Sequence, residues 1–161
     1  DALTHTVNAV EWMLGPADRI AADVAHLVLD GVDVEDTAHV LARHGGVLAS
    51  YALNQHQAPN ESSLDVHCPG GSYRFEPHHN RLRRMARGAD AWQDEVFDVP
   101  ERDTGFIAQA NAFLDAVAGR QAVSCTLREG LATLETCLAI LAAADDEEVH
   151  LRQTGGQETS P

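Results

Sequence analysis

The chain has 161 residues, a hydrophobic fraction of 44% and a net charge of −14, and its eleven basic residues are all arginine. Length and composition predict one globular domain with a buried core, and the acidity excludes a nucleic-acid partner, since phosphate binding needs a basic patch. No apolar run is long enough to span a membrane and no signal peptide is present, so a cytoplasmic protein without a membrane partner is expected.

The first predicted helix begins at the amino terminus and ends at Gly15-Pro16. Asp1 and His5 stand at positions i and i+4 and therefore share one face of this helix. A carboxylate beside an imidazole is a common arrangement for moving a proton near neutral pH, although a capping Asp and a surface His also explain the spacing. Asn8 and Trp12 continue the same stripe, where they either reach a bound ligand or pack against a neighbouring helix or domain.

The middle of the chain alternates apolar and polar residues, which predicts β-strands. Gly45-Gly46 is expected to turn one antiparallel hairpin and Pro69-Gly70-Gly71 a second one. The predicted strands cover residues 32–43, 47–55, 63–68, 72–76, 82–86 and 95–99.

Two helices are predicted after the strands. The first is capped by Asp103 or Thr104 and ends at Gly119, and Thr126-x-x-Glu129 forms a capping box that opens the second. A short edge strand is expected at Val149–Leu151. The inward faces are expected to carry Phe106, Ala110, Phe113, Leu114 and Val117 on the first helix and Leu127, Leu131, Leu134, Leu138 and Leu141 on the second.

Strands clustered between helices predict an α+β fold, a predominantly antiparallel or mixed open sheet with helices packed on one face. This domain is expected to cover residues 1–152, and residues 153–161 read as a disordered tail. The open face is expected to carry Tyr51 and Leu53 or their strand neighbours. It is either mostly polar and solvated, or it buries apolar side chains against another subunit.

Six short motifs follow one another along the chain. They are Asp1-x-x-x-His5, Glu11-Trp12-Met13-Leu14-Gly15, the segment 32–38, the hairpin 44–49, the helix segment 106–117 and the helix opening 126–131. Through the order and spacing of these motifs, residues 1–151 resemble the C-terminal domain of the Gfo/Idh/MocA family, the glucose–fructose oxidoreductase and inositol dehydrogenase group.

The resemblance implies hydride transfer between NAD or NADP and a sugar or polyol carbon that bears a hydroxyl group. His5 would transfer the hydroxyl proton or relay it to a lysine of the preceding domain, Asp1 would be its partner, and Asn8 and Trp12 would contact the substrate. The chain contains neither a G-x-G-x-x-G turn nor a lysine. It is therefore expected to be the substrate-binding and oligomerisation half of the enzyme, inactive alone, with the cofactor bound mainly by a missing N-terminal dinucleotide-binding domain.

The resemblance also implies a homodimer or tetramer formed through the open sheet face. Two alternatives remain: a non-catalytic module that binds a sugar or assembles subunits, and a nicotinamide-dependent glycosidase of the same family. The acidity and the absence of lysine have two explanations, adaptation to high salt or a GC-rich genome. No zinc-type spacing is present, so no metal is expected. Free buried thiols are predicted at Cys68, Cys125 and Cys137, and a solvated surface at Arg81, Arg83, Arg84 and Arg87.

Overall fold

The computed structural model describes residues 2–145, and the fold class is α+β, as the sequence predicts. The predicted strand at Val149–Leu151 and the predicted tail lie outside the described residues. The helices are α1 (Ala2–Leu14), α2 (Thr104–Val117) and α3 (Leu127–Asp145), with a 3-10 turn η1 at Pro77–His79. The strands are β1 (Arg19–Ala25), β2 (Thr37–His44), β3 (Val47–Asn54), β4 (Leu64–Cys68), β5 (Gly71–Glu76), β6 (Arg81–Ala86) and β7 (Gln93–Val96).

The described chain divides into two compact units, each with its own antiparallel sheet. The first unit comprises residues 2–55 and 127–145 and holds the sheet β1-β2-β3 with α1 and α3, while residues 56–126 hold the sheet β4-β5-β6-β7 and α2. The sequence predicts a single sheet, and it does not predict β1. The alternation of apolar and polar residues in the β1 sequence is weak, because alanines lie on both faces of the strand. That residues 1–152 act as one domain stays a prediction.

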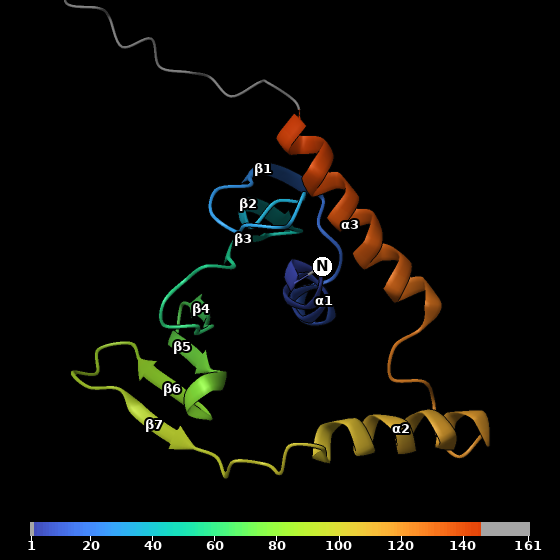
Figure 1. Cartoon of the computed structure of the whole chain (residues 1–161). Helices are drawn as coiled ribbons and strands as arrows, with labels where there is room; N and C mark the ends of the chain where they lie inside the picture. The colour runs from blue at the N-terminus through green and yellow to red at the C-terminus, as the bar shows by residue number, and fades with distance from the viewer. Residues whose placement is uncertain (1, 146–161) are drawn as a thin grey trace, which may run out of the picture. The chain divides into compact units, whose positions relative to one another are not determined.

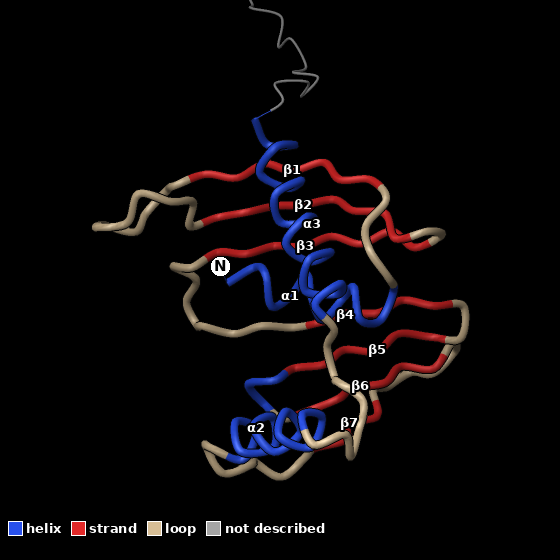
Figure 2. The backbone as a smooth tube through the Cα atoms, turned by 90° about the vertical axis from the view of Figure 1, so that its right-hand side faces the viewer, coloured by secondary structure: helices blue, strands red, loops and turns tan. Residues whose placement is uncertain are grey.

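In the first unit, α1 and α3 lie on the same side of the β1–β3 sheet (Figures 1 and 2). The side chains of β2 explain why the helices cover this face. Its buried residues are Ala38, Val40, Ala42 and His44, and the residues between them point to the other face. Val7 and Val10 of α1 and Ile140 of α3 complete this core.

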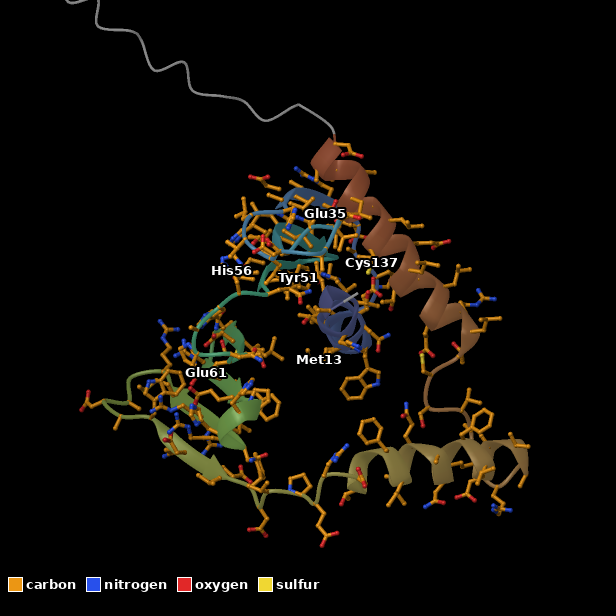
Figure 3. All side chains as sticks on the ribbon, viewed as in Figure 1. Met13, Glu35, Tyr51, His56, Glu61 and Cys137 are labelled. Carbon is orange, nitrogen blue, oxygen red and sulfur yellow. The ribbon has the colours of Figure 1, made fainter. Side chains whose placement is uncertain are left out.

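Tyr51 and Leu53 are on the helix-covered face, which corrects the prediction that they belong to the open one. Tyr51 is paired with Val40 and Leu53 with Ala38, and cross-strand partners point to the same side of a sheet. Tyr51 is buried on the side of the sheet that faces α1 (Figure 3). The open face instead carries the alternate residues of β3, which include Leu48 and Ser50.

Asp36 is a buried carboxylate that organises the loop between β1 and β2. Its oxygens accept the backbone N–H groups of Leu27 at 3.0 Å and of Val28 and Leu29 at 2.8 Å, together with the hydroxyl of Thr37 at 2.9 Å. These four donors, the Leu29 N–H foremost, hold the pKa of Asp36 well below its usual range although burial opposes them. The loop is thus tied to the start of β2.

In the second unit, one face of the β4–β7 sheet is a ladder of ion pairs. Asp94 accepts from Arg83 at 2.9 Å and from Arg81 at 3.4 Å, and Arg81 also donates to Glu76 at 2.8 Å. The guanidinium of Arg83 lies 5.3 Å from the ring centroid of Trp92. Two of the four arginines of the predicted basic cluster, Arg81 and Arg83, are therefore neutralised within their own sheet, in agreement with a solvated surface.

The predicted inward faces of α2 and α3 are wrong. The leucines of α3 are exposed, and its buried residues are Thr133, Thr136 and Ile140, which lie on the opposite side of the helix. No residue of α2 is buried. The exposed apolar residues include Phe106, Phe113, Leu114 and Val117 of α2 and Leu127, Leu131, Leu134, Leu138 and Leu141 of α3.

Candidate functional site

Helix α1 carries three of the four predicted site residues, His5, Asn8 and Trp12, and it ends at Leu14, as Gly15-Pro16 predicts. Its apolar side packs into the core through Val7 and Val10. A second side, formed by Thr4, Asn8 and Glu11, hydrogen-bonds to α3. The remaining side is exposed.

His5 and Trp12 lie on the exposed side of α1, where Trp12 is 80% exposed. Within residues 2–145, no hydrogen bond or ion pair of His5 is present. Asp1 lies outside the described residues, so its pairing with His5 stays a prediction. The other two sides of α1 are anchored in the core and to α3. An imidazole on its exposed side can therefore contact a substrate or a cofactor that approaches from solvent.

Asn8 is turned toward α3 rather than toward the exposed side. Its amide donates to the hydroxyl of Thr133 at 3.0 Å, and that hydroxyl donates to a carboxylate oxygen of Glu11 at 2.8 Å. The other Glu11 oxygen accepts from Thr136 at 2.5 Å. These bonds make a polar seam between α1 and α3, and Asn8 takes part in it as a packing residue.

Thr4 extends the polar seam by one turn, with its hydroxyl 3.6 Å from the sulfur of Cys137. Cys137 is half-buried on the side of α3 that faces α1 (Figure 3), whereas Cys68 and Cys125 are exposed. All three are free thiols, as predicted, but only Cys137 has even a partly buried position. The sequence does not reveal the seam, because threonine and glutamate on a helix are usually read as solvent-facing residues.

A buried hydrogen-bond chain joins the end of α1 to the sheet. Nδ1 of His44 lies 2.7 Å from the carbonyl oxygen of Gly15, and Nε2 lies 2.6 Å from the hydroxyl of Tyr51. The carbonyl can only accept, so Nδ1 donates to it, which leaves Nε2 to accept from the Tyr51 hydroxyl. Burial and the nearby Glu11 charge raise the pKa of Tyr51 to about 12. The phenol therefore remains a donor at neutral pH.

Two shallow concavities on the described surface lie away from α1. One is at the Cys68–Gly71 end of the β4–β7 sheet and includes Met85 and Arg87. The other lies on the open face of the β1–β3 sheet and includes Arg19 and Leu41. Neither is lined by His5 or Trp12.

Two further properties concern the described residues as a whole. In residues 2–145, no group of three or more His, Cys, Asp or Glu side chains is arranged to hold a metal ion. The helices described between Ala2 and Asp145 include none with the length and apolar character that crossing a membrane requires.

Comparison with known protein families gives a match over the first 74 residues. Residues 1–74 match a family model described as the GFO/IDH/MocA C-terminal domain. This region contains α1, the β1–β3 sheet, β4 and the beginning of β5. No curated protein matches the chain.

Solved oxidoreductase structures share the fold. The WlbA dehydrogenase of Bordetella pertussis, solved with NADH and UDP-GlcNAcA, is 22% identical with a TM-score of 0.70, covering 91% of this chain and 45% of that one. The UDP-N-acetylglucosamine 3-dehydrogenase GnnA of Acidithiobacillus ferrooxidans is 20% identical with a TM-score of 0.71, covering 88% and 44%. Biliverdin reductase of Synechocystis sp. PCC 6803, solved with biliverdin and NADP+, is 16% identical with a TM-score of 0.72, covering 88% and 45%. The chain thus spans less than half the length of each.

Proposed function

Because the match over residues 1–74 identifies this chain as a Gfo/Idh/MocA C-terminal domain, we propose that it is the substrate-binding and oligomerisation half of an NAD(P)-dependent sugar or polyol dehydrogenase. The observation that carries the proposal is His5, exposed on a helix that begins the matched region. His5 accepts the hydroxyl proton as hydride leaves the same carbon, and Asp1 orients its imidazole.

The nicotinamide cofactor belongs to another part of the enzyme in this proposal. Both sheets within residues 2–145 are antiparallel, and no glycine-rich turn there leads from a strand into a helix as it does in a dinucleotide-binding domain. The described residues therefore do not fit the cofactor phosphates. When bound, the cofactor supplies hydride exchange, and this chain supplies the proton-transfer group and contacts to the substrate.

Trp12 is the better substrate contact of the two that the sequence suggests. It stands two turns from His5 on the exposed side of α1, so its ring is available to stack on a sugar. Asn8 would have to release Thr133 before it could reach a ligand. We therefore assign the substrate contact to Trp12 and give Asn8 a supporting role behind it.

Replacement of His5 tests this proposal in the protein joined to its dinucleotide-binding domain. His5→Ala is expected to lower kcat by roughly 10²–10⁴-fold, the usual contribution of a positioned acid/base. His67→Ala is the matched control, since His67 is an exposed histidine on β4. Activity of His5→Ala within twofold of the control would remove His5 from the mechanism.

A non-catalytic module that binds a sugar or assembles subunits is the second candidate. The engagement of Asn8 with Thr133 favours it, since one of the expected substrate contacts is used for helix packing. Sugar binding that persists in a protein with no nicotinamide-dependent turnover would favour the module. Product analysis would separate net oxidation from cleavage of a glycosidic bond by a nicotinamide-dependent glycosidase.

We further propose that the chain self-associates through the open face of the β1–β3 sheet. Leu41 is 67% exposed and Leu48 is 74% exposed on this face, while the opposite face is covered by helices. Exposed neighbouring leucines on a sheet commonly mark a contact with a partner. The expected assembly is a homodimer, or a tetramer built from dimers.

A further inference from the structure

The exposed side of α1 is uncharged, although the chain as a whole is strongly acidic. Glu11 is the one acidic residue of α1, and both of its carboxylate oxygens accept hydrogen bonds from threonines of α3. The exposed residues from Ala2 to Met13 are Ala2, His5, Thr6, Ala9, Trp12 and Met13. In a chain with a net charge of −14, a solvent-facing helix side without a carboxylate or a guanidinium group is suited to an uncharged ligand.

Ala9 stands between the two residues of the proposed site. It follows His5 by four positions and precedes Trp12 by three, so the three side chains lie on the same side of the helix. Seven residues of helix separate the α-carbons of His5 and Trp12 by about 10 Å along the axis. Along this line the imidazole and the indole are separated by no side chain longer than the methyl group of Ala9.

The direction of the side chains decides what a residue at position 9 can reach. Side chains on a helix lean toward its amino terminus and cover the preceding turn. Trp12 and Met13 therefore extend toward Ala9, and they are 80% and 43% exposed, so both present apolar surface to a ligand above Ala9. A longer residue at position 9 would extend toward His5 and cover its imidazole, because side chains four positions apart on a helix contact each other.

We propose that Ala9 is a specificity-determining residue that supports the substrate ring between His5 and Trp12. The inference rests on the proposed function and adds where on α1 the substrate lies. The apolar face of a sugar or cyclic polyol ring lies on Ala9 and against Trp12 and Met13, with the reacting hydroxyl group at His5. The part of the substrate that contacts α1 carries no phosphate or carboxylate.

Helix propensity is a weaker explanation of Ala9. Alanine is the best helix former, but Thr6, a poorer one, is exposed next to His5 on the same helix. This side of α1 is therefore not composed for helix stability. Ala9 and Thr6 share a small side chain instead, which leaves the imidazole accessible.

Access to His5 can be measured without a substrate. Diethyl pyrocarbonate transfers an ethoxycarbonyl group to neutral histidine, and mass spectrometry of peptides follows each histidine separately. In the 161-residue chain, Ala9→Leu is expected to slow the modification of His5 relative to His67, an exposed histidine of β4, in the same sample. Ala2→Leu is the matched control, because it makes the same change on the exposed side of α1 but extends away from His5.

The effect on the reaction is measured in the protein joined to its dinucleotide-binding domain, with a panel of aldohexoses and inositols as substrates. Ala9→Leu is expected to lower kcat/KM of the best substrate by roughly 10–200-fold, the usual cost of a misplaced methylene group in a binding pocket. Most of the loss should lie in KM, because the substrate has to displace the leucine before it reaches His5. Ala9→Ser, which adds one atom, should retain most of the activity. Leucine is nearly as good a helix former as alanine, so the leucine variants should fold, and circular dichroism checks this.

His5→Ala is measured beside these variants and separates the two ways of failing. An Ala9→Leu enzyme as active as Ala2→Leu, in a protein that His5→Ala inactivates, would overturn the role of Ala9 and leave the proposed function intact. Equal rates of His5 modification in Ala9→Leu and Ala2→Leu would also overturn that role. A His5→Ala enzyme that stays active, or a joined protein that oxidises no member of the panel, would contradict the proposed function, and the inference would fall with it.

Discussion

Asp36, His44 and Tyr51 show how single buried polar residues stabilise the first unit. Each is less than 5% exposed, and each is hydrogen-bonded within the unit. Leaving one partner of such a bond unsatisfied costs about 1–3 kcal/mol. These three residues therefore fix the backbone near Gly15, the loop before β2 and the β2–β3 hairpin.

Removal of the Tyr51 hydroxyl should destabilise the chain in a pH-dependent way. Tyr51→Phe leaves Nε2 of His44 without its donor and is expected to lower the free energy of unfolding by about 1–3 kcal/mol at neutral pH. Because the folded pKa of Tyr51 is raised to about 12, its contribution is full below the ordinary phenol pKa of about 10 and is lost as pH rises toward 12. Urea unfolding between pH 7 and 12 measures the difference.

Tyr73→Phe is the control for that measurement, since Tyr73 is 40% exposed and makes no hydrogen bond to another described residue through its hydroxyl. Its stability should stay within about 0.5 kcal/mol of the unaltered chain. Equal losses in Tyr51→Phe and Tyr73→Phe would contradict the role of the buried chain.

The exposed side of α1 can be predicted from residue spacing, but the contacts of α1 with distant parts of the chain cannot. The stripe on the first helix follows from spacing alone, and His5 and Trp12 are indeed on its exposed side. Asn8 belongs to the same predicted stripe, about one-sixth of a turn from His5, yet it contacts Thr133, a residue 125 positions away. A contact of that range depends on where α3 lies, which local spacing does not contain.

At the scale of elements, the turn between β4 and β5 depends on one glycine. A Cβ atom on Gly71 would lie 2.1 Å from the backbone oxygen of Met85, and its φ of +147° disfavours other residues. Gly71→Ala is therefore expected to cost roughly 1–3 kcal/mol by overpacking. Thermal unfolding is the measurement, with Gly70→Ala as control because nothing lies within 4 Å of a Cβ there. Equal melting temperatures would contradict the close approach.

The two sides of α3 should respond differently to the same kind of truncation. Ile140→Ala removes a side chain that is 2% exposed and is expected to cost about 2–5 kcal/mol. Leu138→Ala, two residues earlier and 56% exposed, should change stability by no more than about 0.5 kcal/mol. Denaturant midpoints compare the pair, and a larger loss from Leu138→Ala would show that the leucine side is the packed one.

Most elements are predictable from sequence because their signals are local. Gly15-Pro16, Gly45-Gly46 and the capping residues place the ends of helices and hairpins within a few residues. The inward side of α3 is not predictable in this way, because its leucines and its Thr133–Ile140 stripe have the same helical period. Thr133 and Thr136 are buried with their hydroxyls bonded to Glu11 of α1, and Ile140 is buried on the same side of α3, so hydrophobicity alone selects the wrong stripe.

At the scale of the whole molecule, the apolar sides of α2 and α3 are extensive for a chain of this size. Exposed apolar surface on this scale usually has a partner. The solved structures that share the fold are about twice as long as this chain. In the proposed dehydrogenase, the leucines of α3 and the aromatic residues of α2 are therefore the expected contact surfaces for its other domain.

The chain alone is expected not to bind NAD(H) measurably. Phosphate binding in dinucleotide-binding domains uses a glycine-rich turn at a helix amino terminus, and residues 2–145 contain no such turn after a strand. Isothermal titration of the 161-residue chain with NADH should give no saturable heat at millimolar ligand. Tight binding would contradict the proposal that the cofactor is bound by another domain of the protein.

The polar seam between α1 and α3 has a consequence for protein engineering. A hydrophobic contact tolerates rotation of a helix about its axis, but rotation of α1 by one residue, about 100°, would strip Glu11 of both threonine donors. The hydrogen bonds of the seam can therefore form in only one orientation of α1 about its axis. A design that transfers α1 to another scaffold has to include Thr133 and Thr136, because without them the direction in which the His5 imidazole points is not fixed.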